Sequence, residues 1–123
     1  MTVFRFEDLV VWQRSKSLAV AVHRVTEQGR FARNFGLRDQ VQRASISVMS
    51  NIAEGFERET RAEFARFLMI AKGSAGEVRS QLYLAVELGY LTDDSASPLI
   101  GMSVEVTRML VALRKSLRGP NHA

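Results

Sequence analysis

Three cations in the middle of the chain are spaced so that they would form a row on a helix. Arg61, Lys72 and Arg79 are 11 and 7 residues apart, which brings them to within about 20° of one another around an α-helix. The row would be roughly 27 Å long, and Tyr83 lies close to it. A phosphate backbone can follow a row of cations with an aromatic ring nearby. A solvated helix face also carries charges, so both interpretations stay open.

Five further cations extend the predicted anion-binding surface. They are Arg38, Arg43, Arg114, Lys115 and Arg118. The last three gather at the end of a predicted helix, where the helix dipole alone would favour them. With 17 Lys and Arg against 13 Asp and Glu, the formal net charge is +4 and the pI is about 10.1. This balance favours an anionic partner such as RNA or DNA, although many proteins carry it without one.

A second polar stripe is predicted on one face of the helix over residues 37–54. Its side chains recur at i, i+4, i+7 and i+11, which keeps them on the same side of a helix. They are Arg43, Ser47, Ser50 and Glu54, flanked by Gln40 and Asn51. Such a stripe predicts a polar site in a channel or at a subunit contact. A solvated face, or a face hydrogen-bonded to a neighbouring helix, would show the same pattern.

No arrangement of residues in the sequence favours catalysis. Neither His23 nor His122 follows a Glu by three residues, as the di-metal carboxylate sites of helix bundles require. The absence of Cys removes disulfides, thiolate metal sites and cysteine nucleophiles. Ser45, Ser47 and Ser50 lie inside a predicted helix, where no backbone N–H is free for an oxyanion hole. We therefore expect no enzymatic activity, no metal and no cofactor.

Four amphipathic segments must position these side chains. Apolar residues recur with the helical period over the ranges 8–27, 37–54, 61–89 and 98–118. The connections between these segments are short, and 46% hydrophobic content supports one packed core. The sequence therefore predicts an all-α, antiparallel up-down four-helix bundle that forms a single domain over residues 1–123.

The helix boundaries rest on specific residue types. Gly55 is expected to end the second helix at a positive φ. Thr60 and Glu63 form a T-x-x-E capping box at the start of the third helix. Ser97 and Pro98 are expected to be the N-cap and the first residue of the fourth helix.

Aromatic and small residues add two expectations about packing. Phe31 and Phe35, in the predicted loop over residues 29–36, are expected to close the end of the bundle. Gly73 and Gly76 interrupt the third helix, and each costs about 1 kcal/mol relative to alanine. We expect these glycines to allow the close approach of a neighbouring helix.

Two apolar strips lie outside the predicted core faces. The first is on the third helix and the second on the fourth, and an exposed strip of this kind is typical of a subunit interface. The strips consist of Ile70, Leu84 and Leu88, and of Ile100, Val104 and Val111. We therefore expect a homo-oligomer, which symmetric closure would complete.

Nearly the whole sequence also resembles a known family. The positions that carry the resemblance are Gln40, Arg43-Ala44, Ser47, Ser50 to Gly55, Gly73-Ser74 and Glu77. They are similar to the four-helix bundle protein family, also called the 23S ribosomal RNA intervening-sequence protein family, from about residue 6 to 117. The chain has Ala32 and Met49 where many members have proline. The resemblance implies a ring-like assembly, typically a pentamer, and a relation to accessory proteins of diversity-generating retroelements.

Two functional hypotheses follow. In the first, a non-catalytic accessory oligomer binds RNA or DNA through its basic helix faces, largely independently of sequence. In the second, the oligomer is a structural scaffold that binds a partner protein and has no role with nucleic acid. The N-terminus shows no secretory signal, and no apolar run approaches the ~18 residues that a membrane helix needs. We therefore expect a cytoplasmic protein that does not bind membranes.

Overall fold

The computed structural model describes residues 3–118, which form helices and no strand. The predicted all-α class is therefore confirmed. A five-residue helix, α2, occupies part of the segment that the sequence predicts to be a loop, because so short a helix shows no period. The elements are η1 (Phe6–Asp8), α1 (Val10–Thr26), α2 (Gly29–Arg33), α3 (Phe35–Phe56), α4 (Arg61–Glu87) and α5 (Asp93–Arg118).

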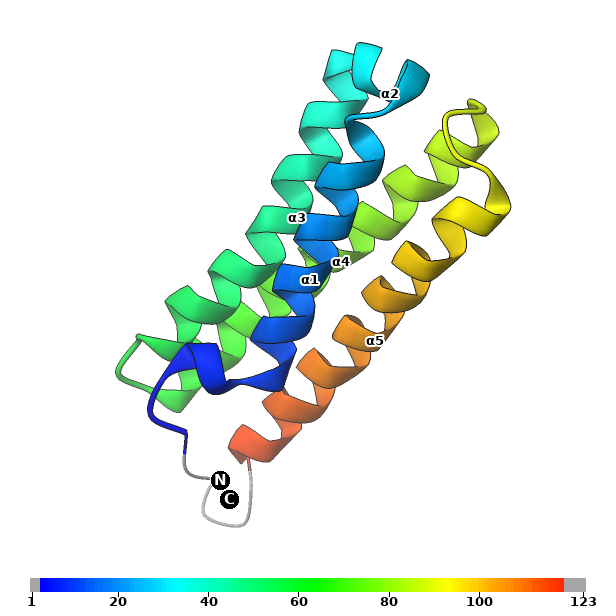
Figure 1. The fold of residues 1–123 in the computed structure, drawn as a ribbon. Coiled ribbons are helices and arrows are strands. Elements are labelled where there is room, and N and C mark those ends of the chain that lie inside the picture. The colour runs from blue at the N-terminus through cyan, green and yellow to red at the C-terminus, as the bar shows by residue number, and fades with distance from the viewer. Residues whose placement is uncertain (1–2, 119–123) are drawn as a thin grey trace.

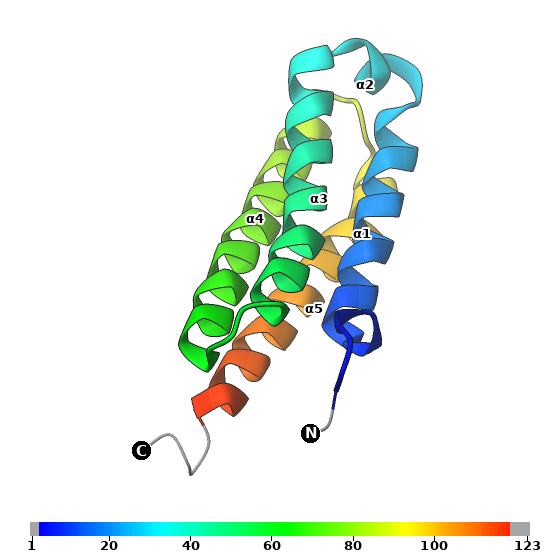
Figure 2. The ribbon, with the colours of Figure 1, turned by 90° about the vertical axis from the view of Figure 1, so that its left-hand side faces the viewer.

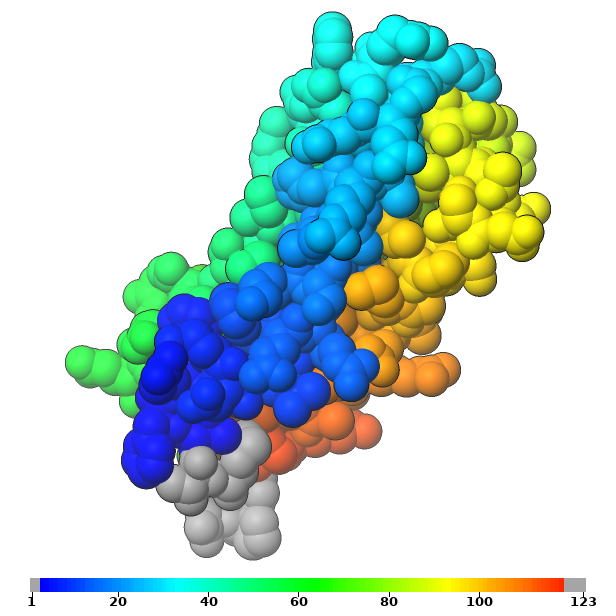
Figure 3. Space-filling model, viewed as in Figure 1, coloured from blue at the N-terminus to red at the C-terminus, as the bar shows by residue number. Residues whose placement is uncertain are grey.

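The four long helices run alternately up and down and pack side by side as a bundle (Figure 1). α3 lies between α1 and α4, and α5 packs against α4 and α1 and so closes the bundle (Figure 2). In the space-filling view α1 fills the space between α3 and α5 (Figure 3). Because the number of long helices is even, η1 and the C-terminal end of α5 lie at the same end (Figure 1).

The core faces that the sequence predicts are buried. Each fully buried aliphatic side chain contributes about 1.5–3 kcal/mol through the removal of apolar surface from water, so these faces provide the main stabilisation of the fold. The Leu, Ile and Val side chains with no exposed surface are Leu18, Val22, Val41, Val48, Ile52, Leu68, Val78, Leu82, Val106 and Leu110.

Aromatic rings close the two ends of the bundle, although one of them does not lie where the sequence predicts. Phe31 is 1% exposed and packs on Tyr90 with ring centroids 5.5 Å apart. Phe35 is 63% exposed, so the prediction that it closes the end is wrong. Its ring instead lies beneath the guanidinium of Arg38, 4.8 Å away. At the other end, Phe6 packs edge-on to Trp12 at 5.3 Å.

Gly55 has a different role from the predicted one. It is buried inside α3, which ends one residue later, and its φ is not positive. A Cβ at this position would lie 2.6 Å from the Cβ of Phe67 and 3.0 Å from a ring carbon of Phe64. Glycine is needed here because α3 and α4 approach each other closely at the turn that joins them.

The two glycines inside α4 do not contact another helix of this chain. A Cβ added at Gly73 or Gly76 would meet no other atom within 4 Å. The prediction that these glycines allow close packing is therefore wrong within the bundle.

The fourth long helix begins earlier than the sequence predicts. Thr92 is its N-cap: the Thr92 hydroxyl accepts a hydrogen bond from the Ser95 amide at 3.0 Å, and the Ser95 hydroxyl accepts one from the Thr92 amide at 2.9 Å. Ser97 is therefore not the cap, and Pro98 lies inside the helix. The additional turn buries Ala96, which is 1% exposed. This burial favours the earlier start of the helix.

Replacing Thr92 by alanine should destabilise the fold by about 1 kcal/mol, because an N-cap side chain is lost. Replacing Ser97 by alanine should leave the stability unchanged or raise it slightly, because Ser97 is an exposed residue within a helix. Thermal unfolding followed by circular dichroism compares the two variants. A larger loss for the Ser97 variant would contradict the boundary described here.

One helix corrects the expectation that no segment is apolar enough to cross a membrane. Within residues 3–118, α5 alone is long and apolar enough for a span by length and composition, with a mean hydropathy of 1.3 over its most apolar 18 residues. In the bundle α5 packs along α1 and α4 and buries Leu99, Val106 and Leu110.

Candidate nucleic-acid interface

The predicted row of cations lies on the side of α4 that faces α5. Tyr83 shares a hollow of ≈380 Å³ with Ile100 of α5, which shows the direction of this side. Lys72 and Arg79 lie within about 40° of Tyr83 around α4. Arg61 and Lys72 are exposed, and Arg79 is half-buried. The row therefore runs along the boundary between the two helices.

Two cations of α5 extend this row on the other side of the boundary. Ser103 marks the side of α5 that faces α4, because its hydroxyl donates to the Ala75 carbonyl at 2.8 Å. Arg114 and Arg118 lie within about 60° of Ser103 around α5. Lys115 lies further out, on the outer face of the helix. We use the name basic flank for the surface formed by five of these cations: Arg61, Lys72, Arg79, Arg114 and Arg118.

No acidic side chain neutralises the basic flank within residues 3–118. The ion pairs in this range join Arg5 to Glu7, Arg14 to Glu105, Arg38 to Asp39, Arg58 to Glu54 and Arg66 to Glu63. None includes a residue of the basic flank. The Nε atom of Arg114 is buried and has no hydrogen-bond partner. Buried donors normally have acceptors, so this Nε atom is an exception among the polar atoms of the flank.

The upper end of the basic flank is less favourable for an anion. The Tyr83 ring is 55% exposed, but its hollow also contains Glu87 and Asp93. These carboxylates would repel a phosphate backbone. The attractive part of the surface therefore runs from Arg79 towards Arg118, and Tyr83 lies at its edge.

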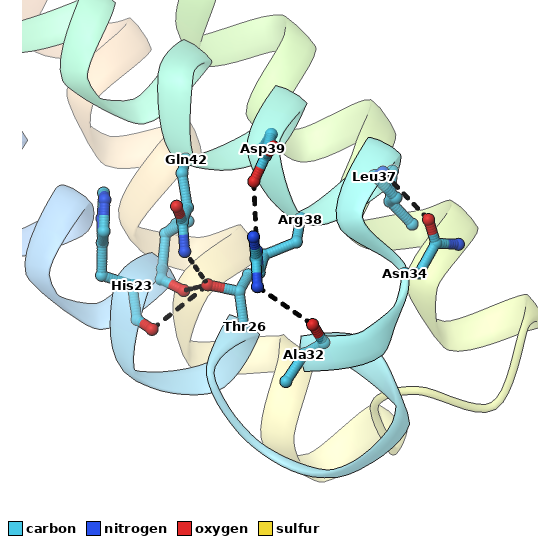
Figure 4. A network of polar contacts seen from close by, with 9 residues as sticks. His23, Thr26, Ala32, Asn34, Leu37, Arg38, Asp39 and Gln42 are labelled. Carbon is cyan, nitrogen blue, oxygen red and sulfur yellow. Dashed lines mark hydrogen bonds and ion pairs between the residues drawn. The ribbon is translucent and has the colours of Figure 1, made fainter.

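The other two predicted cations lie elsewhere. Arg38 donates to Asp39 at 3.1 Å and to the Ala32 carbonyl at 3.1 Å, so it ties α3 to α2 (Figure 4). Nearby, Gln42 donates to the Thr26 hydroxyl at 2.8 Å and links α3 to α1 (Figure 4). Arg43 of α3 is exposed, and it lies next to the side of α4 that faces away from the basic flank.

Arg43 lines a polar groove between α3 and α4. The groove has a volume of ≈300 Å³. Two hydrogen-bonded contacts span it: Ser47 to Ser74 at 2.9 Å, and Gln81 to Gln40 at 3.3 Å. Its lining residues are Gln40, Arg43, Ala44, Ser47, Ser74, Glu77 and Gln81.

The polar stripe of α3 therefore divides into parts with different roles. Ser47 and Asn51 are hydrogen-bonded to each other at 2.9 Å, and Ser47 also bonds to α4. Glu54 forms an ion pair with Arg58 at 2.8 Å. Ser50 is exposed on the rim of a separate hollow. The interhelical interpretation thus holds for Ser47, whereas the Asn51 side chain bonds within α3.

The two apolar strips lie on different faces. Ile70, Leu84 and Leu88 are 40%, 48% and 43% exposed, and they lie beside the polar groove on α4. The strip on α5 is half-buried and lies beside the basic flank; it consists of Ile100, Val104 and Val111. We call these the α4 strip and the α5 strip.

The groups that typically hold a metal are not brought together. Within residues 3–118, no three His, Asp or Glu side chains are placed to bind one ion. His23 contacts the Ala19 carbonyl at 2.8 Å through its Nδ1 atom, which is an ordinary contact inside a helix.

Comparisons relate the chain to known proteins. Residues 7–112 match the family model described as 23S rRNA-intervening sequence protein. Among solved structures, the chain is similar to a protein of unknown function from the S23 ribosomal protein family of Bacteroides thetaiotaomicron. The two are 25% identical, with a TM-score of 0.79 over 85% of this chain and 98% of the other. No curated protein matches the chain.

Proposed function

Because the chain belongs to the 23S rRNA-intervening sequence protein family, as its sequence predicts, we propose that it is an accessory protein without catalytic activity. It assembles into a homo-oligomer and binds nucleic acid largely independently of sequence. The family name refers to an inserted sequence in ribosomal RNA, and this association by itself is not a mechanism. The proposal rests on the basic flank.

The observation that best supports this proposal is a surface of cations that no carboxylate neutralises. Five cations line the boundary between α4 and α5, and none forms an ion pair within the described residues. The phosphates of a nucleic acid would supply the missing negative charge. The cations of the protein would then displace the counterions that are condensed on the nucleic acid. Contacts to phosphates carry no sequence information, so binding through these cations would depend mainly on charge.

Self-association would multiply this surface. The α4 strip and the α5 strip lie on different faces, so one copy can offer its α4 strip to the α5 strip of the next. Contacts of this head-to-tail kind generate a closed ring when the rotation between copies allows it. The family resemblance implies five copies, and each would add a formal charge of +4.

A salt series on the nuclease-treated protein tests the proposal. The mass in solution should be a multiple of 13.8 kDa. Affinity for labelled RNA and DNA should fall linearly with salt in a double logarithmic plot, by about 0.7 to 0.9 per phosphate contacted. No binding at low salt would exclude the nucleic-acid role.

The exposed α4 strip favours a second function, a scaffold that binds a partner protein. Apolar side chains that cover a helix face are typical of protein contacts. A protein partner that is recovered after nuclease treatment would support this function. In either case we propose a cytoplasmic protein that does not bind membranes. A functional relation to accessory proteins of diversity-generating retroelements is also proposed, and it rests on the family resemblance alone.

A further inference from the structure

One carboxylate interrupts the α4 strip. Ile70, Glu77 and Leu84 follow one another at intervals of seven residues, so they lie within about 40° of each other around α4. Glu77 is exposed and forms no ion pair within the described residues. A lone charge between two exposed apolar side chains indicates a face whose partner brings the opposite charge.

The α5 strip carries that opposite charge. Arg108 follows Val104 by four residues and precedes Val111 by three, so it lies within about 60° of both around α5. Arg108 is exposed and has no ion-pair partner among the described residues. The two strips are therefore complementary: apolar, acidic, apolar on α4, and apolar, basic, apolar on α5.

The polar groove beside Glu77 also lacks a donor. The Oε1 atom of Gln81 is buried without a hydrogen-bond partner, while its Nε2 atom donates to Gln40 at 3.3 Å. In this orientation of the two amides, one carbonyl oxygen at the end of the groove has no donor, and a guanidinium has five N–H groups to offer.

The other charged group of the groove limits where a guanidinium can sit. Arg43 lines the α3 side, and Glu77 lines the α4 side. Arg43 repels a second cation, so an entering guanidinium must stay on the α4 side. There it lies between Ile70 and Leu84 and beside the unpartnered amide oxygen.

These observations point to a second copy of this chain as the occupant of the groove: we infer that Arg108 of one copy enters the polar groove of the next and pairs with Glu77. Val104 and Val111 then cover the α4 strip on either side of the ion pair. The inference rests on the self-association proposed above and adds the residue pair that sets its register. Neither Glu77 nor Arg108 belongs to the basic flank, so the ion pair uses none of the five cations of that surface.

Charge exchange tests the pair. Glu77→Arg and Arg108→Glu should each place like charges in contact and raise the dissociation constant of the assembly at least tenfold. The double variant, Glu77→Arg with Arg108→Glu, should restore it to within about threefold of the original protein, because the ion pair is re-formed in reverse. Sedimentation of the full chain over a concentration series measures these constants.

Matched controls separate this contact from the effect of net charge. Glu27→Arg makes the same charge change at the C-terminal end of α1, and Arg24→Glu makes the reverse change on α1; both residues are exposed and outside the strips. These controls should assemble like the original protein. Single variants that behave like the controls, or a double variant that stays dissociated, would overturn the pair.

Measurements on the wild-type protein distinguish the self-association from the residue pair. A mass of 13.8 kDa at every concentration would overturn both the self-association and the pair. Assembly of the wild type with no effect of either single variant would overturn the pair alone. The salt dependence of nucleic-acid binding is a separate readout in both cases.

Discussion

Replacing Gly55 by alanine is expected to lower the stability of the bundle by about 2 kcal/mol, although alanine is the better helix former. Overpacking in a core costs about 1–3 kcal/mol, and occasionally more. Here the new Cβ would lie 2.6 Å from the Cβ of Phe67 and 3.3 Å from the Phe64 carbonyl oxygen. Neither atom can move by a side-chain rotation, so the helices must separate. The gain in helix propensity, about 1 kcal/mol, offsets part of the loss.

The same substitution at Gly73 is the control, and its expected sign is opposite. Gly73 lies inside α4 and is exposed, with no atom within 4 Å of an added Cβ. Alanine there should stabilise the fold by about 1 kcal/mol through helix propensity alone. Thermal unfolding at one fixed protein concentration compares the two, because self-association makes the melting temperature depend on concentration. A stabilised Gly55 variant would contradict the close approach of α3 and α4.

Reversing three charges of the basic flank is expected to abolish nucleic-acid binding at physiological salt. Arg61→Glu, Lys72→Glu and Arg79→Glu together change the formal charge of each chain from +4 to −2, since each replaces a positive by a negative charge. The steep salt dependence of phosphate binding should disappear with these contacts. The fold should survive, because none of the three forms an ion pair within residues 3–118. Fluorescence anisotropy with labelled RNA measures the loss.

A variant with the same net charge distinguishes the basic flank from a general effect. Lys16→Glu, Arg24→Glu and Arg33→Glu change three exposed cations on α1 and α2. This control should retain most of the affinity, because its charges lie away from the boundary between α4 and α5. An equal loss in both triple variants would mean that binding depends on net charge and has no defined surface.

The helices and their buried faces could be predicted from the sequence because one physical signal dominates them. Leu68, Val78 and Leu82 recur with the helical period, and all three have no exposed surface. The Thr60 cap is likewise a local signal, and its hydroxyl accepts from the Glu63 amide at 3.1 Å as predicted. These two signals depend only on neighbours in sequence, and both gave correct structure.

The errors arose where one residue type serves two purposes. Glycine suits both a positive φ and a close contact, and Gly55 serves the second purpose and not the first. Serine followed by proline is typical of a helix start, but Thr92 and Ser95 form a better cap one turn earlier. The choice between such alternatives depends on the neighbouring helices, which local sequence does not reveal.

The candidate site could be predicted only in part for the same reason. Periodicity alone places Arg61, Lys72 and Arg79 on one face of a helix. The relative register of α3 and α4, which sets Gln40 beside Gln81, is a tertiary property. The position of Arg38 between α2 and α3 is tertiary as well. The groove and the separation of the cations into two faces therefore emerged only from the structure.

The even number of long helices also decides how the protein can be attached and labelled. The η1 turn and the C-terminal end of α5 share one end of the bundle (Figure 1), and the arginine-rich end of the basic flank lies there too. A fusion or a surface tether attached before η1 or after α5 would therefore crowd these cations. It would disturb the binding that the experiment is meant to measure. The chain has no cysteine, so a single cysteine at the exposed Arg33, on α2 at the opposite end, would carry a unique label away from them.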